Sequence, residues 1–194
     1  MDRLVVVAIV FALVALAGCA SSPAHFYTLS ATAPAITASS KISVAVGPVS
    51  VPAAVDRPQI VVNTSANEIS VDDFNRWASP LQDNLARVIA EDLVALLGTP
   101  RVTLFPQTLN ADIDYRVQVE IRNFESIPGK SAALDAVWTV RRTRDGKTET
   151  GRTSARENVE GNGYEALAAA HSRGVARLSR DIADVVRALG GAAQ

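Results

Sequence analysis

Residues 113–124 read Ile-Asp-Tyr-Arg-Val-Gln-Val-Glu-Ile-Arg-Asn-Phe, alternating apolar and polar side chains. Successive side chains of a strand point to opposite faces, so this stretch predicts a long β-strand with one face on the core and one in water. Leu134, Ala136, Trp138 and Val140 repeat the pattern, and Asp145-Gly146 predicts a hairpin turn into a more polar strand over 147–159. These strands predict a mostly antiparallel sheet.

A helix is expected before these strands, separated from them by a short strand at residues 102–105. Ser79 fits an N-cap, Pro80 the first helical position and Gln82 the capping box, while Gly98 and Pro100 end the pattern. Between these signals, apolar residues recur at steps of three and four: Leu81, Leu85, Val88, Ile89, Leu93, Leu96 and Leu97.

A second amphipathic helix is expected over residues 163–189, ended by Gly190-Gly191. Its apolar seam is Tyr164, Ala168, His171, Val175, Leu178, Ile182, Val185 and Leu189. His171 falls on this seam, and we interpret it as a satisfied core histidine rather than a ligand.

Residues 41–51 alternate as a strand but are interrupted by Gly47-Pro48, and prolines favour an edge position. Short strands are also expected at 59–63 and 68–71. The order of strands, helix, strands and helix predicts an α+β domain over residues 41–191: a mostly antiparallel sheet with two long amphipathic helices packed on one face.

The N-terminus has the organisation of a bacterial lipoprotein signal peptide. Residues 4–16 form an unbroken apolar run of 13 residues, which is shorter than the roughly 20 residues of a membrane-spanning helix. The run closes on Leu16-Ala17-Gly18-Cys19, which resembles the lipobox. We therefore expect cleavage between Gly18 and Cys19, and a diacylglycerol and an N-acyl chain on Cys19, which together anchor the protein firmly.

Ala20 follows the cysteine rather than Asp, which favours the outer membrane, with the domain facing the periplasm. Residues 19–40 are rich in Ala, Ser, Thr and Pro and predict a lipidated tether. The exception is Phe26-Tyr27-Thr28-Leu29, whose adjacent aromatics are expected to dock on the domain as a short strand.

Composition excludes several functions. The 194 residues carry a net charge of −1, so no basic excess indicates nucleic-acid binding. Cys19 is the only cysteine and there are two histidines, which excludes disulfides, thiolate metal sites and sites built on several imidazoles. No nucleophile elbow, P-loop or dinucleotide-binding motif is present, and we expect neither catalysis nor a cofactor.

Two charged clusters have simpler explanations than chemistry. Asp112 and Asp114 could form an acid–base pair, but a solvated strand face is favoured. The cations around the Asp145 turn could touch lipid headgroups or an acidic partner, yet interleaved acids favour a solvated turn; they are Arg141, Arg142, Arg144, Lys147 and Arg152.

Two further stretches are not explained by folding rules: residues 56–62, Asp-Arg-Pro-Gln-Ile-Val-Val, and residues 74–81, Phe-Asn-Arg-Trp-Ala-Ser-Pro-Leu. Together with residues 26–29 they resemble the ABC-type transport auxiliary lipoprotein family (PqiC-like). Ser79 departs from the acidic residue often found there. The motif residues Arg57, Pro58, Gln59, Arg76 and Trp77 are candidates for a partner interface, although a packing role is as plausible for Trp77.

The resemblance implies a non-enzymatic accessory subunit at the outer membrane. It would dock the periplasmic tunnel of an MCE-domain protein, some of which work with an ABC permease and ATPase, in lipid transport that supports membrane integrity. Assembly into a homo-oligomer is left open. The alternatives are a lipoprotein scaffold or regulator of cell-wall synthesis and, less favoured, a periplasmic hydrolase with an unrecognised site.

Overall fold

The computed structural model describes residues 23–37, 39–106 and 112–191, so the predicted signal peptide, Gly18 and Cys19 lie outside the described residues. The elements, in chain order, are β1 (His25–Tyr27), β2 (Val44–Ser50), β3 (Gln59–Ser65), β4 (Glu68–Trp77), α2 (Leu81–Leu97), β5 (Val102–Leu104), β6 (Tyr115–Ile127), β7 (Ser131–Arg142), β8 (Thr148–Asn158) and α3 (Gly163–Gly191).

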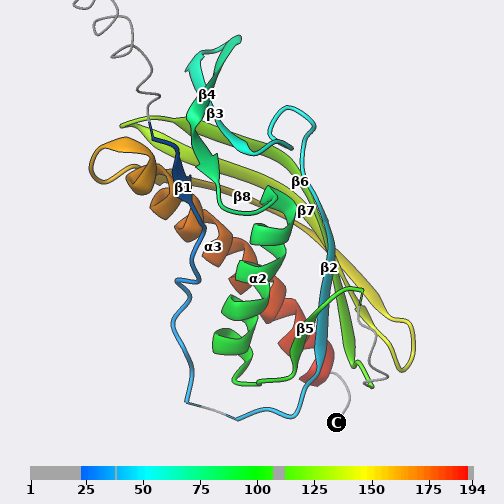
Figure 1. Cartoon of the computed structure of the whole chain (residues 1–194). Helices are drawn as coiled ribbons and strands as arrows, with labels where there is room; N and C mark the ends of the chain where they lie inside the picture. Colours follow the sequence, from blue (N-terminus) through cyan, green and yellow to red (C-terminus); the bar gives the residue numbers. More distant parts are fainter. Residues whose placement is uncertain (1–22, 38, 107–111, 192–194) are drawn as a thin grey trace, which may run out of the picture.

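The core lies between a five-stranded sheet, ordered β5-β2-β6-β7-β8, and the two helices. Helix α2 packs on β2 and β5, α3 packs on β6, β7 and β8, and the helices contact each other. Both helices cover the same face of the sheet, as expected (Figure 1). The predicted alternation is confirmed in β6, where Tyr115, Val117, Val119 and Ile121 are buried and the intervening residues are exposed.

The expected single, mostly antiparallel sheet is wrong. There are two sheets and both are mixed: β1 runs parallel to β4 in a three-stranded sheet ordered β1-β4-β3, and β2 runs parallel to both β5 and β6. Helix α2 causes part of this arrangement, because it carries the chain back along the sheet before β5 begins beside β2. Such a crossover joins parallel neighbours, whereas hairpins join the antiparallel ones.

The edge position expected for the strand at residues 41–51 is also wrong, because β2, which forms most of this stretch, lies between β5 and β6. The pairing of β2 with β6 skips from Val46 to Val49, so Gly47 and Pro48 form a bulge in the strand. A proline, which has no N–H to donate, is tolerated inside a sheet at such a bulge.

The helix ends agree with the sequence in part. Gly98 ends α2 in the left-handed conformation, as expected (φ 61°). The capping box is wrong: Pro80, not Ser79, occupies the N-cap position, with an extended ψ of 134° and no side-chain cap. Helix α3 runs through Gly190 and ends at Gly191 rather than stopping before them.

His171 is a core residue, as expected. Its side chain is 1% exposed, its ring stacks on Phe124 with centroids 3.8 Å apart, and Nε2 lies 2.8 Å from the Ser126 hydroxyl. Burial disfavours the charged imidazolium and lowers the pKa of His171 to about 3.

This burial predicts a specific acid sensitivity. Below pH 6.5 His171 binds a proton in the unfolded chain, but in the folded protein it stays neutral down to about pH 3. The free energy of unfolding therefore decreases as the pH falls from 6.5 to 3. The loss approaches ~1.4 kcal/mol per pH unit. Denaturant unfolding of the protein and of His171→Gln across this range should show a steeper decline for the parent; parallel curves would contradict a buried neutral histidine.

Candidate functional site

The two sequence motifs meet at one end of the small sheet. Arg57 and Pro58 precede β3, whose first residue, Gln59, pairs with Arg76 near the end of β4. The Trp77 amide donates a hydrogen bond of 2.7 Å to the Pro58 carbonyl. Segments that are separate in the sequence therefore form one surface.

Trp77 packs inside this arrangement. It is 5% exposed, and its ring meets that of Phe124 edge-to-face at a centroid distance of 6.2 Å. Because Phe124 stacks in turn on His171, Trp77 connects the small sheet to β6 and α3. The packing role weighed for Trp77 is thus confirmed. Arg57 and Pro58 remain exposed, and Gln59 and Arg76 are half-buried.

The expected docking of the N-terminal aromatics is confirmed. Strand β1 pairs with the end of β4, placing Phe26 opposite Arg76 and Tyr27 opposite Trp77. The Tyr27 hydroxyl donates to Asn75 Oδ1 at 2.7 Å, and its ring packs against Tyr164. The Tyr164 hydroxyl donates to Asp72, and desolvation together with this bond raises the pKa of Tyr164 to about 12.

The face of the small sheet opposite Tyr27 and Trp77 carries a row of side chains from all three strands. Because Phe26 and Gln59 both pair with Arg76, the three side chains lie side by side on it. Phe74 lies two residues before Arg76 on the same strand. Phe26 is 64% exposed and Phe74 46% exposed, so the row and its surroundings form a mixed apolar and cationic surface.

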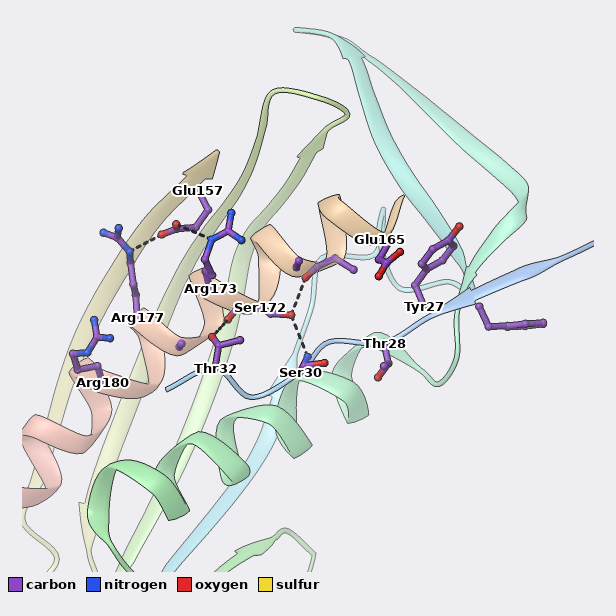
Figure 2. Close-up of a pocket in the computed structure, with 14 residues that line it drawn as sticks. Tyr27, Thr28, Ser30, Thr32, Glu157, Glu165, Ser172, Arg173, Arg177 and Arg180 are labelled. Carbon is purple, nitrogen blue, oxygen red and sulfur yellow. Dashed lines mark hydrogen bonds and ion pairs between the residues drawn. The ribbon is translucent and has the colours of Figure 1, made fainter. Parts of the chain in front are cut away.

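The chain after β1 continues as a strap, residues 28–36, that lies along both helices. Leu29 is fully buried, the Leu29 carbonyl accepts from Arg87 at 2.6 Å, and the Ile36 amide donates to the Ala95 carbonyl of α2 at 3.1 Å. On the α3 side, the Ser30 amide donates to the Ser172 hydroxyl at 3.1 Å (Figure 2). The docked region therefore extends well beyond the predicted short strand.

Asp92 is the main attachment of the strap. Its Oδ1 accepts the backbone amides of Thr32 and Ala33, both at 3.0 Å, and its Oδ2 accepts the Ser179 hydroxyl of α3 at 3.1 Å. The side chain is fully buried, and this desolvation raises the pKa of Asp92 against the opposing hydrogen bonds. One carboxylate thus joins the strap, α2 and α3.

The position of Asp92 in the sequence marks it as unusual. It falls on the apolar face of its helix, three residues after Ile89 and four before Leu96. A charged side chain on a buried face needs partners, and none is apparent from the sequence because two of them are backbone amides of the strap.

A groove of about 1070 Å³ lies between β1, the strap and α3. Its floor includes small residues of α3, and Glu157 of β8 bridges two arginines: Arg177 Nε lies at 2.5 Å and Arg173 Nε at 3.5 Å (Figure 2). Arg180 also lines it and forms no ion pair within the described chain. The groove presents cations beside small apolar residues and has no nucleophile–base pair.

The basic turn lies at the other end of the molecule, near the C-terminus of α3 (Figure 1). Arg142 is buried, donates to the Leu189 carbonyl at the end of α3, and pairs with Asp145 at 2.5 Å. This pairing lowers the pKa of Asp145 to about 2. Arg187 likewise donates to the Leu96 carbonyl at the end of α2. Cations here neutralise the negative ends of two helices, a folding role.

The remaining acidic candidates are structural. Asp114 Oδ2 accepts the amide of Ser43 at 2.8 Å, and the Ser43 hydroxyl shares its one proton between Asp114 Oδ2 at 2.8 Å and the Asp112 carbonyl at 2.7 Å. These bonds fasten the start of β2 to β6. In residues 23–37, 39–106 and 112–191, no group of three or more His, Cys, Asp or Glu side chains could hold a metal ion.

Comparison with known families identifies the arrangement. The sequence profile of the family described as "ABC-type transport auxiliary lipoprotein component" matches residues 27–183, from the end of β1 to α3. The chain belongs to this family. It is a family of transport auxiliary components rather than an enzyme class, and its lipoprotein character implies attachment to a membrane. Neither helix among the described residues has the length and apolar character needed to cross one.

Solved structures share the fold of this auxiliary lipoprotein. An uncharacterized protein matches with a TM-score of 0.70 and 20% identity, over 85% of this chain and 99% of that one. A protein from Xanthomonas campestris, assigned to DUF330, matches with a TM-score of 0.67 and 18% identity, over 82% of this chain and 93% of that one. A search of curated proteins gave no significant match.

Asp92→Ala should release the strap. The substitution leaves two backbone amides and a hydroxyl without their acceptor, and we expect the free energy of unfolding to fall by about 3 kcal/mol. Hydrogen exchange at Thr32 and Ala33 should accelerate beyond the global loss of stability. Gln82→Ala, at an exposed position of the same helix whose side chain forms no hydrogen bond within the described chain, is the control and should change stability by under ~0.5 kcal/mol. Unchanged protection of these amides in Asp92→Ala would contradict the assigned attachment.

Proposed function

We propose that the protein is an outer-membrane lipoprotein subunit of an MCE-type, ABC-linked lipid transport system. The acyl chains on Cys19 hold it in the membrane, and its folded domain docks the periplasmic tunnel of the MCE-domain partner there. It contributes positioning rather than chemistry, in keeping with a family of transport auxiliary components.

The observation that carries this proposal is the docking of the chain directly after the lipobox. Strand β1 begins at His25, six residues after Cys19. Six extended residues span at most about 20 Å, so the anchor keeps the small sheet near the membrane surface. A domain held this closely suits a subunit that receives a partner at the membrane.

The partner contact is proposed at the exposed part of the motif surface. Arg57 and Pro58 are exposed beside half-buried Gln59 and Arg76. Arginine side chains often contribute much of the energy of protein interfaces because they combine large contact area with directional hydrogen bonds. Arg57 forms no side-chain hydrogen bond or ion pair within the described chain, so its guanidinium is available for a partner.

Co-purification tests this function. The full-length protein, tagged at its C-terminus, is extracted from its native membranes in mild detergent, and associated proteins are identified by mass spectrometry. We expect an MCE-domain protein, with or without ABC components, to accompany it. Arg57→Glu should reduce recovery of the partner by about tenfold, corresponding to ~1.4 kcal/mol.

Arg180→Glu is the matched control, since it reverses an exposed arginine without an ion pair on another surface. It should leave partner recovery unchanged at equal protein level. Absence of any MCE or ABC component from the parent sample would contradict the proposed function, whereas equal recovery with Arg57→Glu would contradict only the assigned contact. Recovery of a cell-wall synthase instead would favour a scaffold in that pathway.

A further inference from the structure

Large exposed apolar side chains concentrate on two neighbouring strands. Among the described residues eight such side chains are exposed, and four of them lie on β1 and β4: Phe26 (64%), Ile69 (50%), Phe74 (46%) and Val71 (36%). Exposed apolar residues scattered singly need no explanation, but a concentration of them marks a contact surface.

The shape of this region sets it apart from the body of the protein. Strands β3 and β4 form a hairpin that projects past the five-stranded sheet, at the end where β1 lies (Figure 1). Nearly all of β4 before Asn75 is exposed. Phe26 pairs with Arg76 near the end of β4, while Ile69 and Val71 lie nearer the hairpin turn and pair with Asn63 and Val61. The exposed apolar side chains therefore extend along β4 from the hairpin turn to β1.

Chain length indicates what covers this surface. Phe26 lies seven residues after Cys19, so even a fully extended chain places it within about 25 Å of the anchored residue. Once the acyl chains are in the bilayer, further contact with lipid is effectively intramolecular, and even a weak apolar contact is then occupied. This step rests on the anchor in the proposed function.

The charges near the hairpin do not favour simple electrostatic adsorption. Glu68, Asp72 and Asp73 lie on the same strand as Arg76. The Asp72 carboxylate accepts hydrogen bonds from Asn75 and Tyr164. Apolar side chains are thus the main source of attraction, as in interfacial elements that bury Phe and Leu at the boundary of headgroups and acyl chains.

We propose that β1 and the β3–β4 hairpin insert Phe26, Phe74 and Ile69 into the interfacial layer of the membrane leaflet that holds the lipid anchor. The insertion is a second membrane contact. It fixes the orientation of the domain, with β5 and the C-terminal end of α3 directed away from the bilayer (Figure 1).

The test measures depth with a tryptophan probe. The full-length, lipidated protein is reconstituted in phosphatidylethanolamine–phosphatidylglycerol vesicles containing lipids brominated on their acyl chains. Phe26→Trp and Phe74→Trp are compared with Leu104→Trp, a control on β5 that is 40% exposed. The native Trp77 and Trp138 are each 5% exposed and supply a background, which the parent protein measures.

The added tryptophan at position 26 or 74 should shift its emission to the blue and lose most of its intensity to brominated lipid, whereas the one at position 104 should do neither. Vesicle flotation and circular dichroism accompany each sample to report anchoring and folding. Floating, folded Phe26→Trp and Phe74→Trp proteins with unquenched emission would overturn the insertion while leaving the anchor intact. A lipidated parent that fails to float would overturn the anchor and the insertion together.

Discussion

The structure depends on one buried carboxylate, that of Asp92 in α2, which accepts hydrogen bonds from the strap and from α3. Burying it carries a desolvation cost, which the two strap amides and the Ser179 hydroxyl offset. These bonds fix the strap against both helices. The strap directly follows β1, which pairs in register with β4. The position of the N-terminal segment, on which the proposed function rests, therefore follows from a contact deep inside the domain.

Local pattern was sufficient to predict those elements whose partners are close in sequence. The alternation of Tyr115, Val117, Val119 and Ile121 predicted β6 and its buried face, and Gly98 predicted the end of α2. The docking of β1 was predicted from its adjacent aromatics alone, without its distant partner β4. Parallel pairing was not predicted because it joins strands that are separated by a crossover connection. The side-chain pattern of one strand does not show which distant strand pairs with it. The bulge at Pro48 was not predicted because proline is tolerated both in an edge strand and at a bulge in a central strand.

The motif residues illustrate the same limit at the candidate site. The resemblance to the family made Arg57, Gln59, Arg76 and Trp77 candidates for a partner interface but did not separate packing from contact. Burial separates them: Trp77 connects the small sheet to the core, while Arg57 is left outside. The row formed with Phe26 depends on a parallel pairing, so it could not be predicted either. The two ends of the molecule consequently differ, with apolar and motif surfaces beside the N-terminal strand and cations capping helices at the far end.

The central claim is that Cys19, acylated as the first residue of the mature chain, holds the domain against a membrane. Mass spectrometry of the N-terminal peptide of the protein, isolated from native membranes, tests it most directly. The account predicts a mature chain that begins at Cys19 and carries a diacylglycerol and an N-acyl chain. A peptide that retains residues 1–18, or a Cys19 without acyl chains, would contradict it.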